Sequence, residues 1–269
     1  MPMLARRCRA WRWYKQRMRK STLADNELPE VNFSEEGLVR HLHLGSIWIQ
    51  GSMRVDAPTV LVHEYVQRMM AWLLLVDPAT APMRRALQLG LGAGSLTKFC
   101  ALEVGMRSTA IELNPQVLHA CRGWFALPTD HPRLQVVLAD AAQEICQPQW
   151  QGSVDALQVD LYDQDAAAPV LDSPQFYAHC RNTLTADGCM TVNLFGRSSS
   201  FARSVNSIAQ AFGREAIWAF KATREGNTVV LAQRTATRPD SDVMKQRALY
   251  IQEHWGLPAT KWVRAMQPV

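Results

Sequence analysis

The sequence predicts an α/β protein whose sheet is mainly parallel, with helices on both faces and an antiparallel hairpin at its end. Two patterns carry this prediction. Apolar, strand-like segments alternate with helical segments over residues 85–212, and two more strands follow with only a short connection between them. A third pattern, a glycine-punctuated alternating segment ahead of the first helix, predicts a small β unit in front of the sheet.

Charge and composition divide the chain into a basic tail and linker over residues 1–30, a small β unit over 31–62 and an α/β domain over 63–269. Residues 1–20 hold eight of the 29 basic residues and no acid, which leaves 21 basic against 24 acidic residues in the remainder. The tail is expected either to contact an anionic polymer such as nucleic acid or an anionic lipid surface, or to be a solvated, poorly ordered terminus.

The β unit is expected from the stretch VNFSEEGLVRHLHLGSIWIQGSMRV, in which alternating residues are punctuated by glycines. This pattern predicts two or three short antiparallel strands. His41 and His43 lie on one strand face, which suggests a metal pair. No third ligand lies nearby in the sequence, so an ordinary strand surface is favoured and no metal site is expected.

A helical segment over residues 63–76, ended by Asp77 and Pro78, leads into the alternating units. Five strands follow in order: RALQLG, RSTAIEL, LQVVLAD, VDALQVDLY and CMTVNLF. A helical segment comes after each of them, at residues 95–104, 115–124, 141–146, 173–185 and 200–212. Units of this length predict parallel strands joined by crossover helices.

EAIWAFKA (215–222) and NTVVLAQR (227–234) are two more strands, and only TREG separates them. A connection this short excludes a crossover helix and requires an antiparallel hairpin. A parallel sheet with this ending resembles the Rossmann-like, seven-stranded fold of S-adenosylmethionine-dependent transferases, whereas dinucleotide-binding dehydrogenases usually continue with another helix. Residues 241–255 are expected to form a final amphipathic helix.

The carboxyl ends of the first four strands carry the candidate binding residues, because ligands of such sheets lie beyond those ends. Glycines, which let a main chain approach a ligand closely, follow the first strand, and acids end the next three. A carboxylate after the second strand can accept hydrogen bonds from a ribose diol. The candidate residues are Gly90, Gly92, Gly94, Glu112, Asp140, Ala141, Asp160, Tyr162 and Asp163.

This set predicts a nucleoside site, although Glu112 and Asp140 could instead cap the helices that follow them. The chain has no GxxxxGK[ST] motif, which argues against a nucleoside triphosphate. The dinucleotide motif GxGxxG is incomplete, because Ser95 stands where its third glycine would be.

Over about residues 38–235 the chain resembles the spermidine synthases, which are polyamine aminopropyltransferases. The resemblance is carried by ALQLGLGAG, AIELNPQVLHACRGWF, HPRLQVVLADAAQEI and the stretch from VDLYDQD to CMTVNLF. The last stretch is the most specific, because its acids and its Phe-Tyr pair fall without a gap on the family's positions. These are Asp160, Asp163, Ala168, Leu171, Phe176 and Tyr177.

The resemblance implies a decarboxylated S-adenosylmethionine donor, a putrescine-like amine acceptor, methylthioadenosine as by-product and a role in polyamine biosynthesis. It also implies that Glu112 holds the ribose, Asp140 the adenine and Gln50 the donor. Asp163 would be the general base, and Asp160 would help bind the amine. Acids suit these places, because an amine attacks only when neutral and a carboxylate takes its proton as the C–N bond forms. The sulfonium already carries its leaving group, so no metal is required.

The chain departs from the family pattern on the amine side. Ala93 stands where the family has an Asp that grips the aminopropyl ammonium, and Val62 replaces a Tyr. Leu161 and Tyr162 replace two serines. Tyr162 could supply a missing hydroxyl and Asp165 a missing charge, or both could be ordinary residues at the rim of the site.

Three functions therefore stay open: an aminopropyltransferase, which we favour, a methyltransferase that uses intact S-adenosylmethionine, and a non-catalytic nucleoside-binding homologue. The six cysteines are scattered without a CxxC pair, and the longest apolar run, AWLLLV, is too short to span a membrane. A cytoplasmic protein is expected. A homodimer stays open, with Trp255 and Trp262 as candidate contacts.

Overall fold

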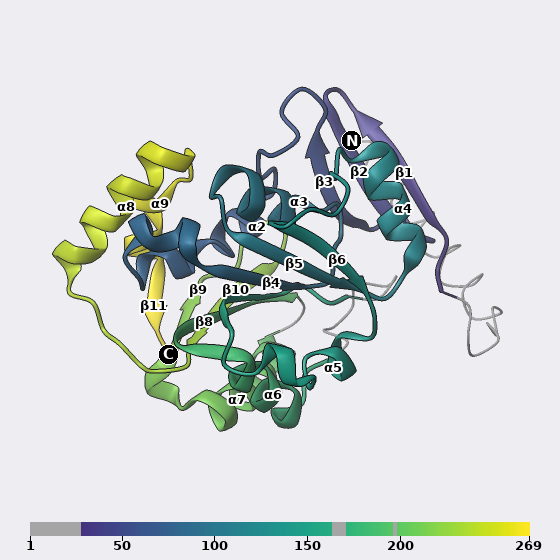
Figure 1. The fold of residues 1–269 in the computed structure, drawn as a ribbon. Helices are drawn as coiled ribbons and strands as arrows, with labels where there is room; N and C mark the ends of the chain where they lie inside the picture. Colours follow the sequence, from purple (N-terminus) through teal and green to yellow (C-terminus); the bar gives the residue numbers. More distant parts are fainter. Residues whose placement is uncertain (1–27, 163–170, 196–197) are drawn as a thin grey trace, which may run out of the picture.

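The computed structural model describes residues 28–162, 171–195 and 198–269 (Figure 1). The predicted basic tail and the candidate residues Asp163 and Asp165 lie outside the described residues. Two sheets form the framework of the rest: a three-stranded antiparallel sheet near the start of the described chain and an eight-stranded, mainly parallel sheet. The predicted fold class is confirmed.

The expected β unit is the antiparallel sheet. In the order in which they pair, its strands are β1 (Val31–Glu36), β2 (Val39–Leu44) and β3 (Ile49–Arg54). Leu42 and Met53 are buried on one face of this sheet, in a cluster with Phe125. At Gly51 a Cβ would lie 2.6 Å from the nitrogen of Ala93, so only glycine lets β3 approach the turn after β4 this closely.

Five parallel strands form the centre of the large sheet, as the alternation predicts. In spatial order they are β6 (Leu134–Leu138), β5 (Arg107–Glu112), β4 (Arg85–Leu89), β7 (Val154–Val159) and β8 (Leu184–Phe195). The chain builds outward from β4 in one direction and, from β7 on, in the other. Ligands of such sheets bind beyond the carboxyl ends of the strands at this reversal of order.

The predicted antiparallel hairpin is also present. β10 (Asn227–Gln233) pairs with β8, and β9 (Ile217–Phe220) pairs with β10. The sheet has one strand more than the seven expected, because β11 (Met266–Pro268) pairs with the outer side of β9. A strand of three residues has no alternation that a sequence could reveal.

Helices cover both faces of the large sheet (Figure 1). On one face lie α5 (Ala141–Glu144), α6 (Pro174–Thr183) and α7 (Ser198–Phe212). On the other face and beside the small sheet lie α2 (Glu64–Arg68), α3 (Ser95–Lys98), α4 (Pro115–Trp124), α8 (Ser241–Trp255) and α9 (Ala259–Ala265). Among the described residues, no helix combines the length and apolar character needed to cross a membrane.

The shorter helical pieces connect these elements. They are the 3-10 segments Ala71–Leu74, Pro78–Met83, Pro148–Trp150 and Arg214–Ala216, and a π-helical turn, Phe99–Glu103, that continues α3. The helical segment expected over residues 63–76 consists of two pieces, α2 and the 3-10 segment Ala71–Leu74, and it ends before Asp77 as predicted. The Asp77 carboxylate also accepts a hydrogen bond from the Ala79 N–H at 3.1 Å and thereby begins the next 3-10 segment.

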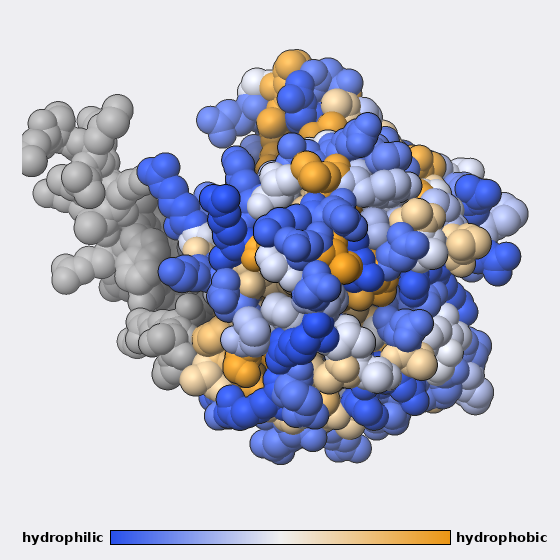
Figure 2. Space-filling model, turned by 90° about the vertical axis from the view of Figure 1, so that its left-hand side faces the viewer, coloured by the Kyte–Doolittle hydropathy of each residue, from blue (hydrophilic) through white to orange (hydrophobic). Residues whose placement is uncertain are grey.

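Two further expectations near the C-terminal half need correction. The helix expected to run to residue 185 ends at Thr183, because Leu184 already pairs with Val154 and begins β8. Trp262 is buried inside the chain and Trp255 packs against the same cluster. Trp262 therefore serves the core of this chain rather than a dimer surface, whereas Trp255 is only partly buried and a dimer contact through it stays a prediction. The side of the molecule that carries α8 and α9 shows mainly hydrophilic residues with scattered hydrophobic ones (Figure 2).

Candidate active site

A glycine turn follows β4 at the carboxyl edge of the sheet. Gly90, Gly92 and Gly94 all have positive φ, at 89°, 51° and 68°, which L side chains rarely adopt. A Cβ at Gly90 would lie 2.5 Å from the main-chain oxygen of Asp160, and one at Gly92 would lie 3.0 Å from that of Gln50. The glycines thus bring this main chain against both the end of β7 and the start of β3.

Glu112, the last residue of β5, fastens the glycine turn. One carboxylate oxygen accepts a hydrogen bond from the Leu91 N–H at 3.0 Å, and the other accepts from the Asn114 N–H at 2.8 Å. Burial raises the pKa of Glu112, and these main-chain bonds oppose the shift. The helix cap of α4 is Asn114, whose side chain accepts from the Gln116 N–H. Glu112 is therefore not that cap.

A cavity of about 460 Å³ lies beyond these strand ends. Eight of the predicted site residues line it: Gln50, Gly90, Gly92, Glu112, Asp140, Ala141, Asp160 and Tyr162. Its other walls are largely leucine, isoleucine and valine side chains. Gly94 is set apart from this lining and precedes α3 as its N-terminal boundary residue. An apolar cavity with a few convergent polar groups is typical of a small-molecule site.

Asp140 borders the cavity and also caps a helix. One of its carboxylate oxygens accepts a hydrogen bond from the Ala142 N–H at 2.7 Å, at the start of α5. The side chain is exposed. The capping interpretation is therefore correct for this bond, and the position at the cavity stays compatible with an adenine contact.

Asp160 is a carboxylate whose pKa is shifted by its surroundings. It follows β7 and accepts hydrogen bonds from the Asn193 amide at 2.9 Å and from the Tyr65 hydroxyl. Burial raises its pKa to about 6, against the lowering effect of these two donors. The group is therefore largely ionised at neutral pH, in surroundings that favour a cationic partner.

Asp160 also borders a second, smaller hollow next to the glycine turn. Ser52, Tyr65, Ala93 and Ser95 are among the residues that line it. Ala93 is buried against Gly51, so the position where the family carries an acid presents only a methyl group. On this side of the glycine turn, Asp160 is the one carboxylate among the described lining residues.

Tyr162 has both hydrogen bonds of its hydroxyl committed to main chain. It donates to the Asn193 carbonyl at 2.8 Å and accepts from the Phe195 N–H at 2.6 Å. Burial raises its pKa, and the charge of Asp160 adds to that effect. The side chain joins the end of β7 to the end of β8, which suits a positioning residue.

The two histidines of β2 have different surroundings. His43 contacts the Ser34 hydroxyl and the Trp48 carbonyl, as an ordinary strand surface would allow. His41 instead begins a chain in which the Ser52 hydroxyl lies 2.7 Å from its Nδ1 and 2.6 Å from the Nε2 of His63. Burial lowers the pKa of both His41 and His63. In the part of the chain that the structure describes, no group of three potential metal ligands occurs.

Tyr65 is the site residue that the sequence analysis missed. The family's tyrosine is absent at Val62, but another tyrosine, Tyr65, lies three residues later in VHEYV. α2, which begins at Glu64, places Tyr65 against Asp160. A tyrosine only three residues from the family's position is the signal in the sequence that points to it.

The chain is similar in sequence to curated polyamine aminopropyltransferases. A polyamine aminopropyltransferase of Neisseria meningitidis serogroup A is 33% identical over 237 residues, which is 87% of this chain and 88% of the relative. That of Chromobacterium violaceum is 30% identical over 256 residues, or 94% of each chain. No protein-family model matches.

Solved structures share the fold. A probable spermidine synthase from Corynebacterium glutamicum matches with a TM-score of 0.68 at 18% identity, over 91% of this chain and 93% of that one. Human methyltransferase-like protein 13, in complex with SAH, matches with a TM-score of 0.62 at 19% identity, over 75% of this chain and 92% of that one. The chain therefore has the fold that these spermidine synthase and methyltransferase structures share.

Among proteins with this fold, sequence identity assigns the chain to one family. Identity of 30–33% over most of the chain shows that this protein belongs to the polyamine aminopropyltransferase family. The resemblance found in the sequence is confirmed.

Proposed function

We propose that this protein transfers an aminopropyl group from decarboxylated S-adenosylmethionine to a small diamine of the putrescine type, with methylthioadenosine as by-product. The observation that carries the proposal is Asp160, a half-buried carboxylate at the point where the strand order reverses. It borders both the 460 Å³ cavity and the small hollow beside Tyr65, of about 30 Å³, so it lies where the proposed donor cavity meets the Tyr65 side of the glycine turn. Membership of the family supports the reaction.

In this proposal the nucleoside of the donor occupies the large cavity. Glu112 holds the ribose, since each of its oxygens keeps a lone pair beyond the one used by a main-chain N–H. Asp140 and the main chain of Ala141 lie at the adenine end. Gln50 contacts the donor from the side of the small sheet, where its main chain already lies against Gly92.

The amine is handled by carboxylates. A bond forms between the amine nitrogen and the aminopropyl carbon, the bond from that carbon to sulfur breaks with its electron pair leaving on sulfur, and the amine proton passes to a carboxylate. Asp163, outside the described residues, keeps the general-base role that the resemblance gives it. Asp160 holds the remote ammonium by a charge-assisted hydrogen bond. Tyr162 positions the segment between them.

Methyl transfer from intact S-adenosylmethionine is the second candidate, and Ala93 is the observation that favours it. Without an acid at that position, the site lacks a partner suited to the ammonium of a decarboxylated donor. It also lacks a like charge that would repel the carboxylate of the intact donor. The shared fold of methyltransferase-like protein 13 is compatible with this alternative.

Calorimetric titration with each donor separately, followed by product analysis with putrescine, tests the proposal. Preference for the decarboxylated donor and release of methylthioadenosine would support aminopropyl transfer. Preference for the intact donor with release of S-adenosylhomocysteine would replace it with methyl transfer, and binding of neither donor would exclude both. Glu112→Ala should weaken both donors, whereas Asp130→Ala, at an exposed ion pair with Arg122, should weaken neither.

The proposal places this chemistry in the cytoplasm, as the sequence analysis expects. A homodimer is part of the same expectation, and light scattering of the purified protein measures it directly.

A further inference from the structure

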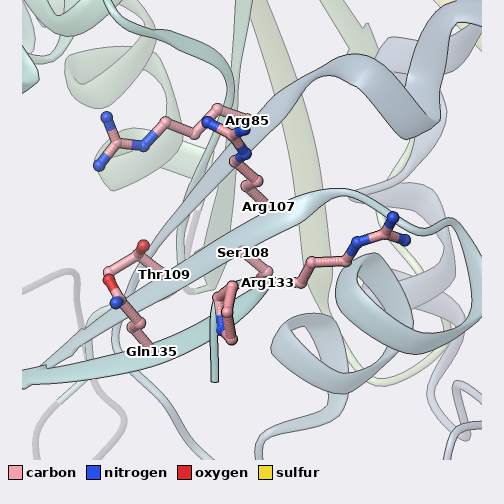
Figure 3. A pocket seen from close by; sticks show the side chains of 7 residues that line it. Arg85, Arg107, Ser108, Thr109, Arg133 and Gln135 are labelled. Carbon is pink, nitrogen blue, oxygen red and sulfur yellow. The ribbon is translucent and has the colours of Figure 1, made fainter. Parts of the chain in front are cut away.

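A second hollow, of about 420 Å³, lies at the opposite edge of the large sheet, where β4, β5 and β6 begin (Figure 3). Arg85, Arg107, Arg133, Thr109 and Gln135 are among its lining residues, and none of the residues that line it is acidic. The proposed reaction uses no group at this edge. A hollow bordered by three guanidinium-bearing side chains therefore needs its own explanation.

Arg85 and Arg107 lie directly opposite each other as the first residues of two paired parallel strands. Figure 3 shows the Arg107 side chain extending toward the base of Arg85. Like charges at opposed strand positions are destabilising. Burial lowers the pKa of Arg85, and the charge of Arg107 lowers it further. The two strand starts thus place two positive charges at the same edge of the sheet.

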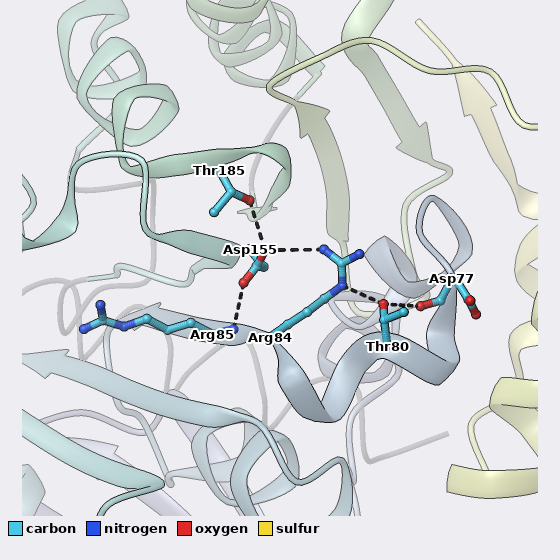
Figure 4. Close-up of polar contacts among 6 residues, drawn as sticks. All are labelled: Asp77, Thr80, Arg84, Arg85, Asp155 and Thr185. Carbon is cyan, nitrogen blue, oxygen red and sulfur yellow. Dashed lines mark hydrogen bonds and ion pairs between the residues drawn. The ribbon is translucent and has the colours of Figure 1, made fainter.

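The nearby carboxylate of Asp155 does not compensate this pair. One oxygen of Asp155 accepts from the Arg84 guanidinium at 3.3 Å and from the Thr185 hydroxyl at 3.0 Å, and the other accepts from the main-chain N–H of Arg85 at 2.9 Å (Figure 4). The guanidinium of Arg85 points away from Asp155 in the same view. Asp155 therefore neutralises Arg84 and only fixes the backbone of Arg85.

The remaining contacts of the three arginines are with neutral groups. Arg85 lies 4.4 Å from the ring centroid of Trp150 and has a long hydrogen bond, 3.4 Å, to the Ser153 hydroxyl. Arg133 donates to the Gly105 carbonyl, also at 3.4 Å. Across the described ranges, no ion pair involves Arg85, Arg107 or Arg133. The hollow thus carries an excess of positive charge.

We propose that this hollow binds a compact anion with more than one negative group, of the diphosphate class. Guanidinium groups pair with phosphate oxygens through two parallel hydrogen bonds, and separated guanidiniums need a ligand that offers more than one anionic group. Thr109 and Gln135, paired across β5 and β6, add neutral polar groups to the same hollow. A hollow of about 420 Å³ matches the size of a compact ligand, whereas the extended backbone of a nucleic acid would run beyond it.

Calorimetric titration of the full-length protein with pyrophosphate, in about 0.15 M salt so that long-range attraction is screened, tests this site. Pyrophosphate has no nucleoside and so does not compete for the donor cavity. Arg107→Ala should weaken binding at least tenfold, and Arg107→Lys should weaken it less. Arg214→Ala removes one positive charge from a residue bonded to Asn206 and should leave binding unchanged. The basic tail is the same in every variant.

Absence of saturable pyrophosphate binding, or equal weakening by Arg107→Ala and Arg214→Ala, would overturn the proposal. A single-stranded oligonucleotide that binds more tightly than pyrophosphate and depends on Arg107 would also overturn it, in favour of a nucleic-acid surface. Thermal unfolding supplies a second test. Without pyrophosphate, Arg107→Ala should melt no lower than the parent protein, because it removes a repulsion. With pyrophosphate, the melting temperature of the parent should rise and that of the variant should not.

Discussion

The candidate site has two halves, which the proposed function assigns to the nucleoside and to the amine, and they are built in different ways. In the half assigned to the nucleoside, main-chain groups form most of the site. Glycines with positive φ form the turn, and the Glu112 carboxylate holds it by accepting hydrogen bonds from two N–H groups. In the amine half, side chains from three separate segments meet, as Tyr65 and Asn193 do at Asp160. A site formed by main-chain groups changes little when neighbouring side chains are substituted. A site formed by side chains can change with a single substitution.

Asp160→Asn tests the amine half and should have the largest effect. Loss of the charge should lower the turnover of aminopropyl transfer by about 10–10²-fold, the range for losing one hydrogen bond to a charged group. Donor affinity should stay nearly unchanged, because Glu112 and the glycine turn are untouched. Steady-state assay of methylthioadenosine release, with donor titration alongside, separates the two quantities. Equal loss of donor affinity would mean that the two halves are not separable.

Gly90→Ala tests the nucleoside half. A Cβ at this position would lie 2.5 Å from the Asp160 oxygen and the residue would keep a φ of 89°, so the free energy of unfolding should fall by about 1–3 kcal/mol and donor affinity should fall with it. Gly37→Ala is the matched control, since it has a positive φ of 59° but open space around it. Urea unfolding of both variants gives the comparison. Equal destabilisation with donor affinity intact would show that close packing at Gly90 is unimportant.

Ala93→Asp should sharpen the difference between donors. A carboxylate there adds a charge-assisted partner for the ammonium of the decarboxylated donor, so preference for that donor over the intact one should rise about tenfold. Ala93→Asn, of nearly the same size, should produce a much smaller change. Because Ala93 is buried against Gly51, circular dichroism must first show that both variants fold. An unchanged donor preference in a folded Ala93→Asp variant would place the donor elsewhere.

Tyr65→Phe should have the smallest effect, and pH reveals it. The Tyr65 hydroxyl lowers the pKa of Asp160, which burial raises to about 6, so removing the hydroxyl should raise that pKa. Transfer activity in the parent protein should fall as the pH drops through about 6, because Asp160 becomes protonated. In Tyr65→Phe the fall should begin at higher pH, with activity recovered at alkaline pH. A pH profile that does not move would remove Tyr65 from the site.

The fold and the positions of the residues around the cavity are predictable from the sequence, because both depend on patterns that a chain displays locally. Strand and helix alternation gave the order of elements, the TREG connection gave the hairpin, and the glycine spacing gave the turn. Glu112, Asp140 and Gln50 all border the predicted cavity, while their roles toward a donor stay predictions.

The amine half depends on side chains that meet only in three dimensions. Tyr65 and Asn193 are 128 positions apart in the chain, and no local pattern connects either of them to Asp160. The two bonds of Tyr162 to β8 are equally invisible in the sequence. The short strand β11 was missed for a similar reason, since its pairing with β9 depends on tertiary position alone.

The two edges of the large sheet carry opposite charges. Glu112, Asp140 and Asp160 lie at the carboxyl edge, and Arg85, Arg107 and Arg133 lie at the amino edge of the same strands. Such a separation adds to the electric field of the molecule a component that runs along the strands. A polyamine cation diffusing nearby is drawn toward the edge where the proposed reaction occurs and repelled from the other. Long-range attraction of this kind acts before the amine contacts the site, and salt screens it. Capture of the amine should therefore be fastest at low ionic strength.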